Sequence, residues 1–391
     1  MTNPQAIRQL NESRALKTLF RYGQMSRADL ARRLQLTRST VGSIVQSLGE
    51  GGLIKEQSDK ANEEGARVGR PGIGTELNAD GAFFVGADIG VDRISVLAVD
   101  LACRIRFEEA ADFRGSARPA GEVADFTAAM VRRAVGRLPG PDRVRGLCVA
   151  VPGFPSRDGR SYNAAILGWR DVPIGELLRQ RLQTSELLVE NDANAFAVAA
   201  TYTGDDWATP DVLVVLIENG VGAGIVSGGR LFRGKLGLAG EIGHLRIGQE
   251  GFVFDPQRPG RMESYVGKDA LLARYRYNGG QAATLPEFLE ALGRNEAPAT
   301  RTAADWGRWL ARALANAISI LGPQQVILGG SVSAVYPFVA DAIEQRLAAS
   351  LIEGYAMPTI ELYAGHVAGP ALGGAYLMHQ AMLNLGGTLD V

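Results

Sequence analysis

The segment from Phe83 to Ile89 reads FFVGADI and is followed by two further apolar runs, Ile94 to Val99 and Ile105 to Phe107. Tight turns separate the three runs, so they predict three successive strands. A helix is expected next from about Ala120 to Leu138, and then a strand from Val144 to Val151. The order is therefore β-β-β-α-β, which is typical of one half of a two-lobed α/β protein.

The same order recurs in the second half of the chain. It is carried by apolar runs near Val212–Ile217, Gly224–Ser227 and Leu231–Phe232, a helix with Leu310, Leu314, Ile318 and Leu321 in register, and a strand at Val326–Leu328. With 391 residues and 46% hydrophobic content, the chain is long enough for several domains with their own cores. We expect two α/β lobes with a ligand cleft between them.

The first 77 residues have a different pattern, which predicts a winged helix-turn-helix. An amphipathic helix from Gln5 to Tyr22 is expected to end at Gly23, and Ser26 is expected to cap a second helix. Thr37 would cap a third helix, whose apolar residues are Val41, Ile44, Val45 and Leu48. Two strands, at Leu53–Lys55 and Thr75–Leu77, would complete the wing.

This N-terminal segment is basic, although the whole chain has a net charge of −1. From Met1 to Lys55, nine basic residues stand against three acidic ones, which favours a polyanionic partner. A solvated basic face or a protein-interaction module is the alternative. We predict DNA contacts from Thr37, Arg38, Ser39, Thr40, Ser43 and Gln46 on the third helix, and from Arg67 and Arg70 in the wing.

Polar residues that could bind a polyol lie in two segments, one containing several glycines and one at the expected start of a helix. Glu241, His244 and Glu263 can each accept from or donate to a hydroxyl group. Asn191 and Asp192 follow an expected strand at 187–190 and begin a helix. The alternatives are that the glutamates are solvated surface charges, that His244 is a core histidine, and that Asp192 only caps the helix.

The two cysteines, Cys103 and Cys148, lie in apolar, strand-like runs with no metal-binding or disulfide spacing. This usage fits a reducing compartment. The sequence has no apolar run of about 18 residues and no signal peptide. We therefore expect a soluble, cytoplasmic protein without membrane contact.

The motif Gly240-Glu241-Ile242-Gly243-His244, followed by Gly260-x-x-Glu263-x-Tyr265, resembles the signature of the ROK family of sugar kinases and sugar-responsive repressors. The segments from Ser26 and from Thr37 resemble the DNA-binding head of ROK repressors. The resemblance implies an actin/hexokinase-like fold. We expect a head at 1–77, a first lobe at 78–201 plus 371–391, and a second lobe at 202–370.

The resemblance also implies roles for individual residues, and at some positions this chain departs from the family pattern. It implies that Asn191, Asp192, Glu241, His244 and Glu263 bind a sugar, with Asp192 in the position of the kinases' catalytic base. A sugar-contacting asparagine of the family corresponds to Ala165 here. The family's zinc-binding cysteines correspond to Phe254, Pro256 and Arg261, so we expect no metal.

The phosphate-binding loops depart further from the kinase pattern. Where ROK kinases have Asp-x-Gly-Gly-Thr, this chain has Asp88-Ile89-Gly90-Val91-Asp92; where they have Gly-Thr-Gly-x-Gly, it has Glu218-Asn219-Gly220-Val221-Gly222. Both changes add a carboxylate where phosphate would lie. We expect a sugar-responsive repressor that binds operator DNA as a homodimer or homotetramer, without a cofactor and without enzymatic activity. A sugar kinase, using Asp88 and Asp192 to hold magnesium, and a DNA-binding protein whose body serves only assembly are the alternatives.

Overall fold

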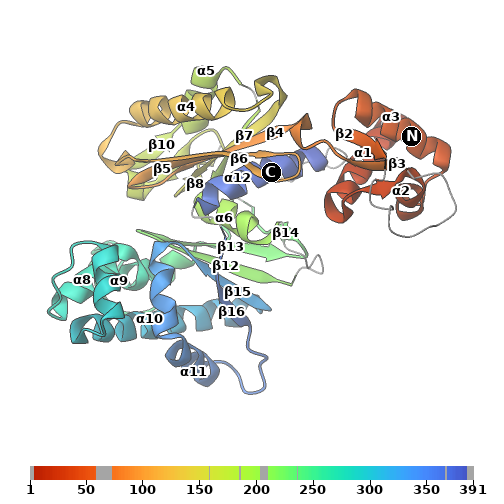
Figure 1. Ribbon diagram of the computed structural model, residues 1–391. Helices are drawn as coiled ribbons and strands as arrows, with labels where there is room; N and C mark the ends of the chain where they lie inside the picture. Colours follow the sequence, from red (N-terminus) through yellow and green to blue (C-terminus); the bar gives the residue numbers. More distant parts are fainter. Residues whose placement is uncertain are drawn as a thin grey trace.

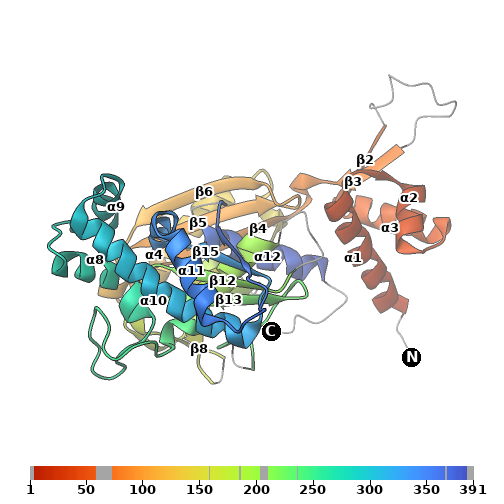
Figure 2. The same cartoon turned by 90° about the horizontal axis from the view of Figure 1, so that it is seen from below.

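The computed structural model describes residues 4–58, 73–157, 159–184, 186–202, 210–235, 237–365 and 368–384. Two five-stranded sheets lie one above the other, and a small N-terminal head lies beside the first of them (Figure 1). Figure 2 shows the head standing out from the two-sheet body.

The head contains three helices and a three-stranded sheet of order β1-β3-β2. The elements are α1 (Pro4–Tyr22), β1 (Met25–Ser26), α2 (Arg27–Leu34), α3 (Arg38–Glu50), β2 (Ile54–Ser58) and β3 (Ile73–Leu77). The Ser26 side chain accepts from the Asp29 amide and that of Thr37 from the Thr40 amide, so both expected N-caps are confirmed. Arg67 and Arg70, the expected wing residues, lie outside the described residues.

The first lobe is built on a sheet of order β11-β7-β4-β5-β6. Its elements are β4 (Phe83–Ile89), β5 (Arg93–Asp100), β6 (Ile105–Asp112), α4 (Ala120–Gly136), β7 (Val144–Val151), α5 (Ile174–Leu182) and β11 (Leu187–Asn191). Strand β4 pairs antiparallel with β5 and parallel with β7. Helices α4 and α5 cover the outer face of this sheet (Figure 1).

The second lobe repeats the plan, with a sheet of order β14-β13-β12-β15-β16. Its elements are β12 (Val212–Ile217), β13 (Val221–Ser227), β14 (Arg230–Leu231), α7 (Glu263–Val266), α8 (Lys268–Tyr277), α9 (Leu285–Gly293), α10 (Ala297–Leu321), β15 (Gln325–Gly329), α11 (Ala340–Ser350) and β16 (Thr359–Leu362). The duplicated order confirms the expected actin/hexokinase-like fold. Across the described ranges, every helix is too short or too polar to cross a membrane.

Some local predictions were wrong. Strand β6 runs to Asp112 rather than Phe107, because it alternates between exposed and half-buried residues and so lacks a continuous apolar run. A small sheet of β8 (Phe154–Pro155), β9 (Tyr162–Ala164) and β10 (Trp169–Val172) was missed, because its strands are very short. Cys103 lies in the turn after β5 with φ of 59°, not in a strand, whereas Cys148 is in β7 as expected.

Two helices, α6 (Asp192–Thr201) and α12 (Gly369–Leu383), lie between the sheets (Figure 1). Ala195, Val198 and Ala199 of α6 pack with α12 against the first sheet. Ala193, Phe196 and Ala197 pack against the second sheet. Glycines allow this close approach: a Cβ at Gly224 of β13 would lie 2.3 Å from the Ala197 Cβ, and one at Gly373 of α12 would lie 1.6 Å from the Ala195 carbonyl oxygen. Small residues on both sides therefore set the separation of the lobes.

We expect Gly373→Ala to destabilise the protein, although alanine is favoured over glycine inside a helix by about 1 kcal/mol. The backbone of α6 cannot move away without disturbing both sheets, so the overpacking cost of about 1–3 kcal/mol should exceed that gain. Thermal unfolding followed by circular dichroism measures the effect. Gly49→Ala in α3 is the matched control, because a Cβ there meets nothing within 4 Å. A Gly373→Ala variant as stable as the Gly49→Ala variant would contradict the tight packing of α6.

Candidate functional site

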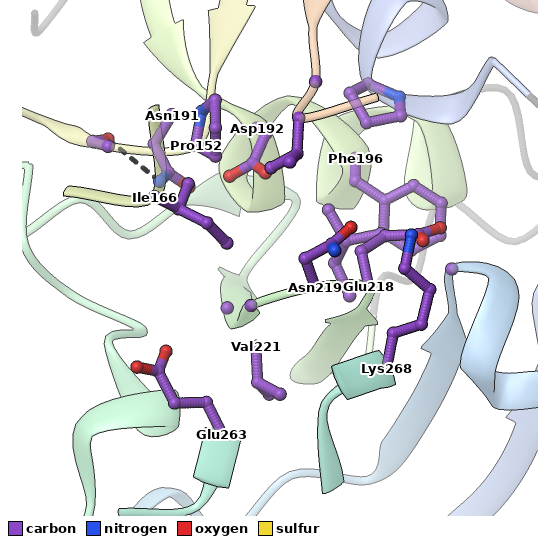
Figure 3. A pocket seen from close by; sticks show the side chains of 18 of the residues that line it. Pro152, Ile166, Asn191, Asp192, Phe196, Glu218, Asn219, Val221, Glu263 and Lys268 are labelled. Carbon is purple, nitrogen blue, oxygen red and sulfur yellow. Dashed lines mark hydrogen bonds between the residues drawn. The ribbon is translucent and has the colours of Figure 1, made fainter. Parts of the chain in front are cut away.

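A cavity of about 1320 Å³ lies between the two lobes. All five residues predicted to bind a sugar line it: Asn191, Asp192, Glu241, His244 and Glu263. In Figure 3, Asn191, Asp192 and Ile166 lie on one side of the pocket, and Glu263 and Val221 lie on the other. Glu218, Asn219 and Lys268 group at another part of the pocket. The cavity thus has a polar end, where Asn191, Asp192 and Glu263 lie, and a second end next to Glu218.

Asn191, and not Asp192, is the N-cap of α6. Its Oδ1 accepts from the Asn194 amide at 3.0 Å, and its Nδ2 donates to the Gly153 carbonyl at 3.0 Å. The alternative reading of Asp192 as the cap is therefore wrong. Asp192 is the first residue of the helix, and one of its oxygens accepts from the Ala193 amide at 2.8 Å. Asp192 also lines the cavity, where its carboxylate can accept from a ligand hydroxyl.

The carboxylates of the cavity affect one another's protonation. Burial, with Glu241 and Glu218 nearby, raises the pKa of Asp192 to about 7. Burial and the nearby carboxylates of Asp192 and Glu218 also raise the pKa of Asp88 well above its usual range. The pKa of Glu241 is raised too, mainly by burial. A polyol, which can donate to these groups without adding charge, fits this environment better than a second anion does.

Arg261 connects the residues of the second lobe at the polar end. Its guanidinium contacts Asp255 Oδ2 at 2.7 Å and Glu263 Oε1 at 3.0 Å, and it donates to His244 Nδ1 at 3.1 Å. Because a guanidinium cannot accept, Nδ1 must carry the lone pair, and Nε2 carries the hydrogen of the neutral ring. That Nε2 is 3.6 Å from Glu241 Oε2. His244 therefore presents a donor beside the acceptors Glu241 and Glu263.

The residues present do not fit the zinc ion that the family resemblance implies. Phe254, Pro256 and Arg261 offer no thiolate, and the Arg261 guanidinium donates to His244 Nδ1. Among the described residues, no group of three or more His, Cys, Asp and Glu side chains is placed to hold a metal ion. The Arg261 guanidinium, which is always charged, links the side chains of this segment instead. Sequence reasoning missed this role, although Asp255 and Glu263 near Arg261 in the chain were its signal.

The polar end also has an apolar wall. Ala165 and Ile166 line the cavity, and Ile166 Cδ1 lies 3.6 Å from the position of a Cβ built on Gly220. The Ala165 side chain has no polar atom, whereas the family resemblance implies a sugar-contacting asparagine at this position. Val221 lies on the same side of the cavity as Glu263 (Figure 3). A ligand here meets hydrogen-bonding groups on two sides and methyl groups on a third.

The second end of the cavity is occupied by the protein's own charges. Glu218 Oε1 accepts from the Ser331 amide at 2.6 Å, and its Oε2 accepts from the Ser331 hydroxyl. Lys268, the first residue of α8, pairs with Asp92 of the β4–β5 turn at 2.9 Å, and this ion pair joins the two lobes. The carboxylates of Glu218 and Asp92 thus bind the Ser331 amide and the Lys268 ammonium group, which could otherwise bind phosphate oxygens.

The predicted DNA face is on the outer side of the head. Thr37, Arg38, Ser39, Ser43 and Gln46 are exposed, and Thr40 is half-buried. The basic charge is smaller than the count from Met1 to Lys55 indicates, because two acidic residues beyond that segment form ion pairs with it: Glu56 with Arg27 and Glu76 with Lys55. Arg38 has no partner among the described residues and so stays available.

The class of protein is defined by an actin/hexokinase-like body with a polar interlobe cavity, preceded by a helix-turn-helix head. The ROK family profile matches residues 84–381, so the chain belongs to the ROK family. The xylose repressor of Bacillus subtilis (strain 168) is 24% identical over 343 residues, covering 87% of each chain. The DNA-binding transcriptional dual regulator NagC of Escherichia coli (strain K12) is 25% identical, covering 98% of this chain and 95% of NagC.

Two solved structures show the same fold. A ROK family transcriptional regulator described as a homolog of the E. coli MLC protein superposes with a TM-score of 0.78 and 22% identity, covering 97% of both chains. A ROK family glucokinase from Streptomyces griseus, in complex with glucose and AMPPNP, gives a TM-score of 0.63 at 24% identity and covers 76% of this chain and all of the kinase. The fold is therefore shared by regulators and kinases.

We expect Asp192→Asn to change how stability depends on pH. Because the pKa of Asp192 is raised to about 7 in the folded protein, the folded state holds more protons than the unfolded chain between about pH 4 and about pH 7. Stability is therefore lost as the pH rises through this window, and the asparagine variant should escape that loss, by up to about 4 kcal/mol. Melting temperatures at about pH 5 and about pH 8 test this.

The quantity to compare is the melting temperature of the variant minus that of the wild type, which should increase with pH. Asp142→Asn, at an exposed aspartate outside the cavity, is the control and should give a difference that does not vary with pH. If the difference for Asp192→Asn were also independent of pH, it would contradict the raised pKa of Asp192.

Proposed function

We propose that this chain is a sugar-responsive transcriptional repressor that binds operator DNA through the head and a sugar or polyol in the interlobe cavity. The observation that carries the proposal is the convergence of five polar residues from both lobes on one cavity, joined to a head with an exposed helix-turn-helix face. A protein whose body served only assembly would have no need of such a pocket. The relatives named xylose repressor and NagC support the same reading.

The cavity favours a receptor over a sugar kinase. Glu218 is bound to Ser331, and Asp92 is bound to Lys268, at the end of the cavity where the kinase motifs would place phosphates. Two unit charges of like sign at about 4 Å repel by about 4 kcal/mol at an effective dielectric of 20, so both carboxylates oppose ATP. The fold is compatible with a kinase, which makes kinase activity the second candidate to test.

The partners follow from the same proposal. Heads of this size contact DNA as pairs that read half-sites about one helical turn apart, so we propose a homodimer or homotetramer acting in the cytoplasm on a pseudo-palindromic operator. The residues proposed to contact DNA are Thr37, Arg38, Ser39, Thr40, Ser43 and Gln46, together with Arg67 and Arg70 of the wing sequence.

A thermal-shift panel tests the sugar site. D-xylose, D-glucose, N-acetyl-D-glucosamine and the 6-phosphates of the two hexoses are added to the full chain, because a ligand of the native state raises its melting temperature. We expect one of them to do so, and Glu263→Gln to weaken its binding about 10- to 100-fold through the loss of a charge-assisted hydrogen bond. Glu353→Gln, at an exposed glutamate outside the cavity, is the matched control.

The sugar found in this way is then mixed with magnesium and ATP, and release of ADP is followed. We expect no sugar-dependent release. Turnover of about 1 s⁻¹ or faster would make the protein a kinase and overturn the repressor assignment. No shift with any sugar, or equal shifts for Glu263→Gln and Glu353→Gln, would contradict the proposed effector site.

Arg38→Ala tests the DNA face. A duplex is first selected from a random-sequence pool by the wild-type protein, and its affinity is then measured by fluorescence anisotropy. We expect the variant to lose about 1–3 kcal/mol of specific binding if Arg38 contacts a base edge. Arg301→Ala removes the same charge from an exposed position of α10 and should bind like the wild type. Equal affinities of the two variants would count against this placement of α3.

A further inference from the structure

We propose that helix α6 transmits the occupancy of the cavity to the head through an aromatic joint, which consists of Phe20 of α1, Tyr202 at the end of α6 and His379 of α12. This inference rests on the proposed function and describes how the effector site is connected to the DNA-binding head. It makes Tyr202 and Phe20 positioning residues, since neither lines the cavity.

The first end of the connection is in the cavity itself. Asn191 caps α6 and Asp192 is its first residue, so a ligand held by Asp192 acts directly on the end of this helix. Glu263 faces the same space from the second lobe (Figure 3). A ligand that contacts both sides favours one separation of the lobes over others, which is the differential interaction that a conformational shift requires. The ten residues of α6 span about 15 Å.

The other end of α6 reaches the head. The Tyr202 ring stacks on the Phe20 ring with centroids 5.9 Å apart and an interplanar angle of 23°. Phe20 also contacts His379, with ring centroids 4.8 Å apart. Two turns before Phe20 in α1, the Ser13 hydroxyl donates to the Leu383 carbonyl of α12. Leu383 is part of the head's hydrophobic core. The end of α12 is therefore packed into the head, and the end of α6 contacts it through Phe20.

A hydrogen bond fixes the geometry of the joint. His379 is buried, and this burial lowers its pKa to about 4, so the ring is neutral near pH 7. Its Nε2 is 3.0 Å from the Leu101 carbonyl, which can only accept, so Nε2 carries the hydrogen. Nδ1 must then accept from the Tyr202 hydroxyl, at 2.8 Å. Tyr202 is thus tied to α12 and to the turn after β5 as well as to Phe20.

The packing of α6 lets it move only with its neighbours. Cβ atoms built at Gly222 and Gly224 of β13 would lie 2.8 Å and 2.3 Å from the Cβ atoms of Ala193 and Ala197, and one built at Gly373 of α12 would lie 1.6 Å from the Ala195 carbonyl oxygen. Such contacts leave little room for α6 to shift against β13 and α12. A displacement at Asp192 is therefore passed along α6 to Tyr202, which contacts Phe20 of the head.

The test compares how sugar changes hydrogen exchange in the head of three variants of the full chain. Tyr202→Phe keeps the ring and removes the hydrogen bond to His379, and Phe20→Leu removes the stacked ring. Phe113→Leu is the matched control, because Phe113 is also half-buried and stacks on Phe126 at 4.5 Å, but lies in the first lobe away from α6. D-xylose and N-acetyl-D-glucosamine are the probes, together with the hexose 6-phosphates.

In the wild type and in Phe113→Leu, we expect the sugar to raise the melting temperature and to change exchange in α1 severalfold. In Tyr202→Phe and Phe20→Leu, the sugar should still raise the melting temperature while its effect on α1 disappears. If both variants keep the full effect on α1, or if the wild type shows a thermal shift without any change in α1, the relay is wrong although the sugar site stands. If no probe alters the melting temperature of the wild type, the proposed function fails, and the relay fails with it.

Discussion

The packing of one ten-residue helix against two sheets is the constraint on which the arrangement of this protein depends. Because five of the ten residues of α6 are alanine and the helix faces glycines on β13 and α12, the two lobes can approach closely on either side of it. The same helix begins inside the cavity and ends beside the head. Its position therefore determines both where the polar residues meet and how the cavity is connected to α1.

The cavity holds charged groups of the protein at both of its ends. At the polar end, Arg261 donates hydrogen bonds to His244 and Asp255 and forms an ion pair with Glu263, in the segment for which the family resemblance implies a metal ion. At the other end, Glu218 and Asp92 bind groups of the protein itself. In both places an internal partner stands where the family resemblance implies a metal ion or a phosphate, while Asn191, Asp192 and Glu241 still line the cavity.

Much of the fold could be predicted from the sequence, because the apolar runs of β4, β7 and β12 and the caps at Ser26 and Thr37 are strong local signals. The convergence of the five cavity residues was predicted through the family resemblance rather than from spacing. The role of Arg261 and the joint at Tyr202 were not predicted. They depend on contacts between residues far apart in the chain, such as Phe20 with His379, for which no local pattern exists.

The most direct test of the account is a reciprocal titration. The dissociation constant of the sugar identified by thermal shift is measured with and without a saturating duplex selected by the wild-type protein, and the affinity for the duplex is measured with and without the sugar. Because linkage is reciprocal, the account predicts the same factor in both directions, of about 5- to 150-fold. Sugar affinities that are identical with and without DNA would contradict it.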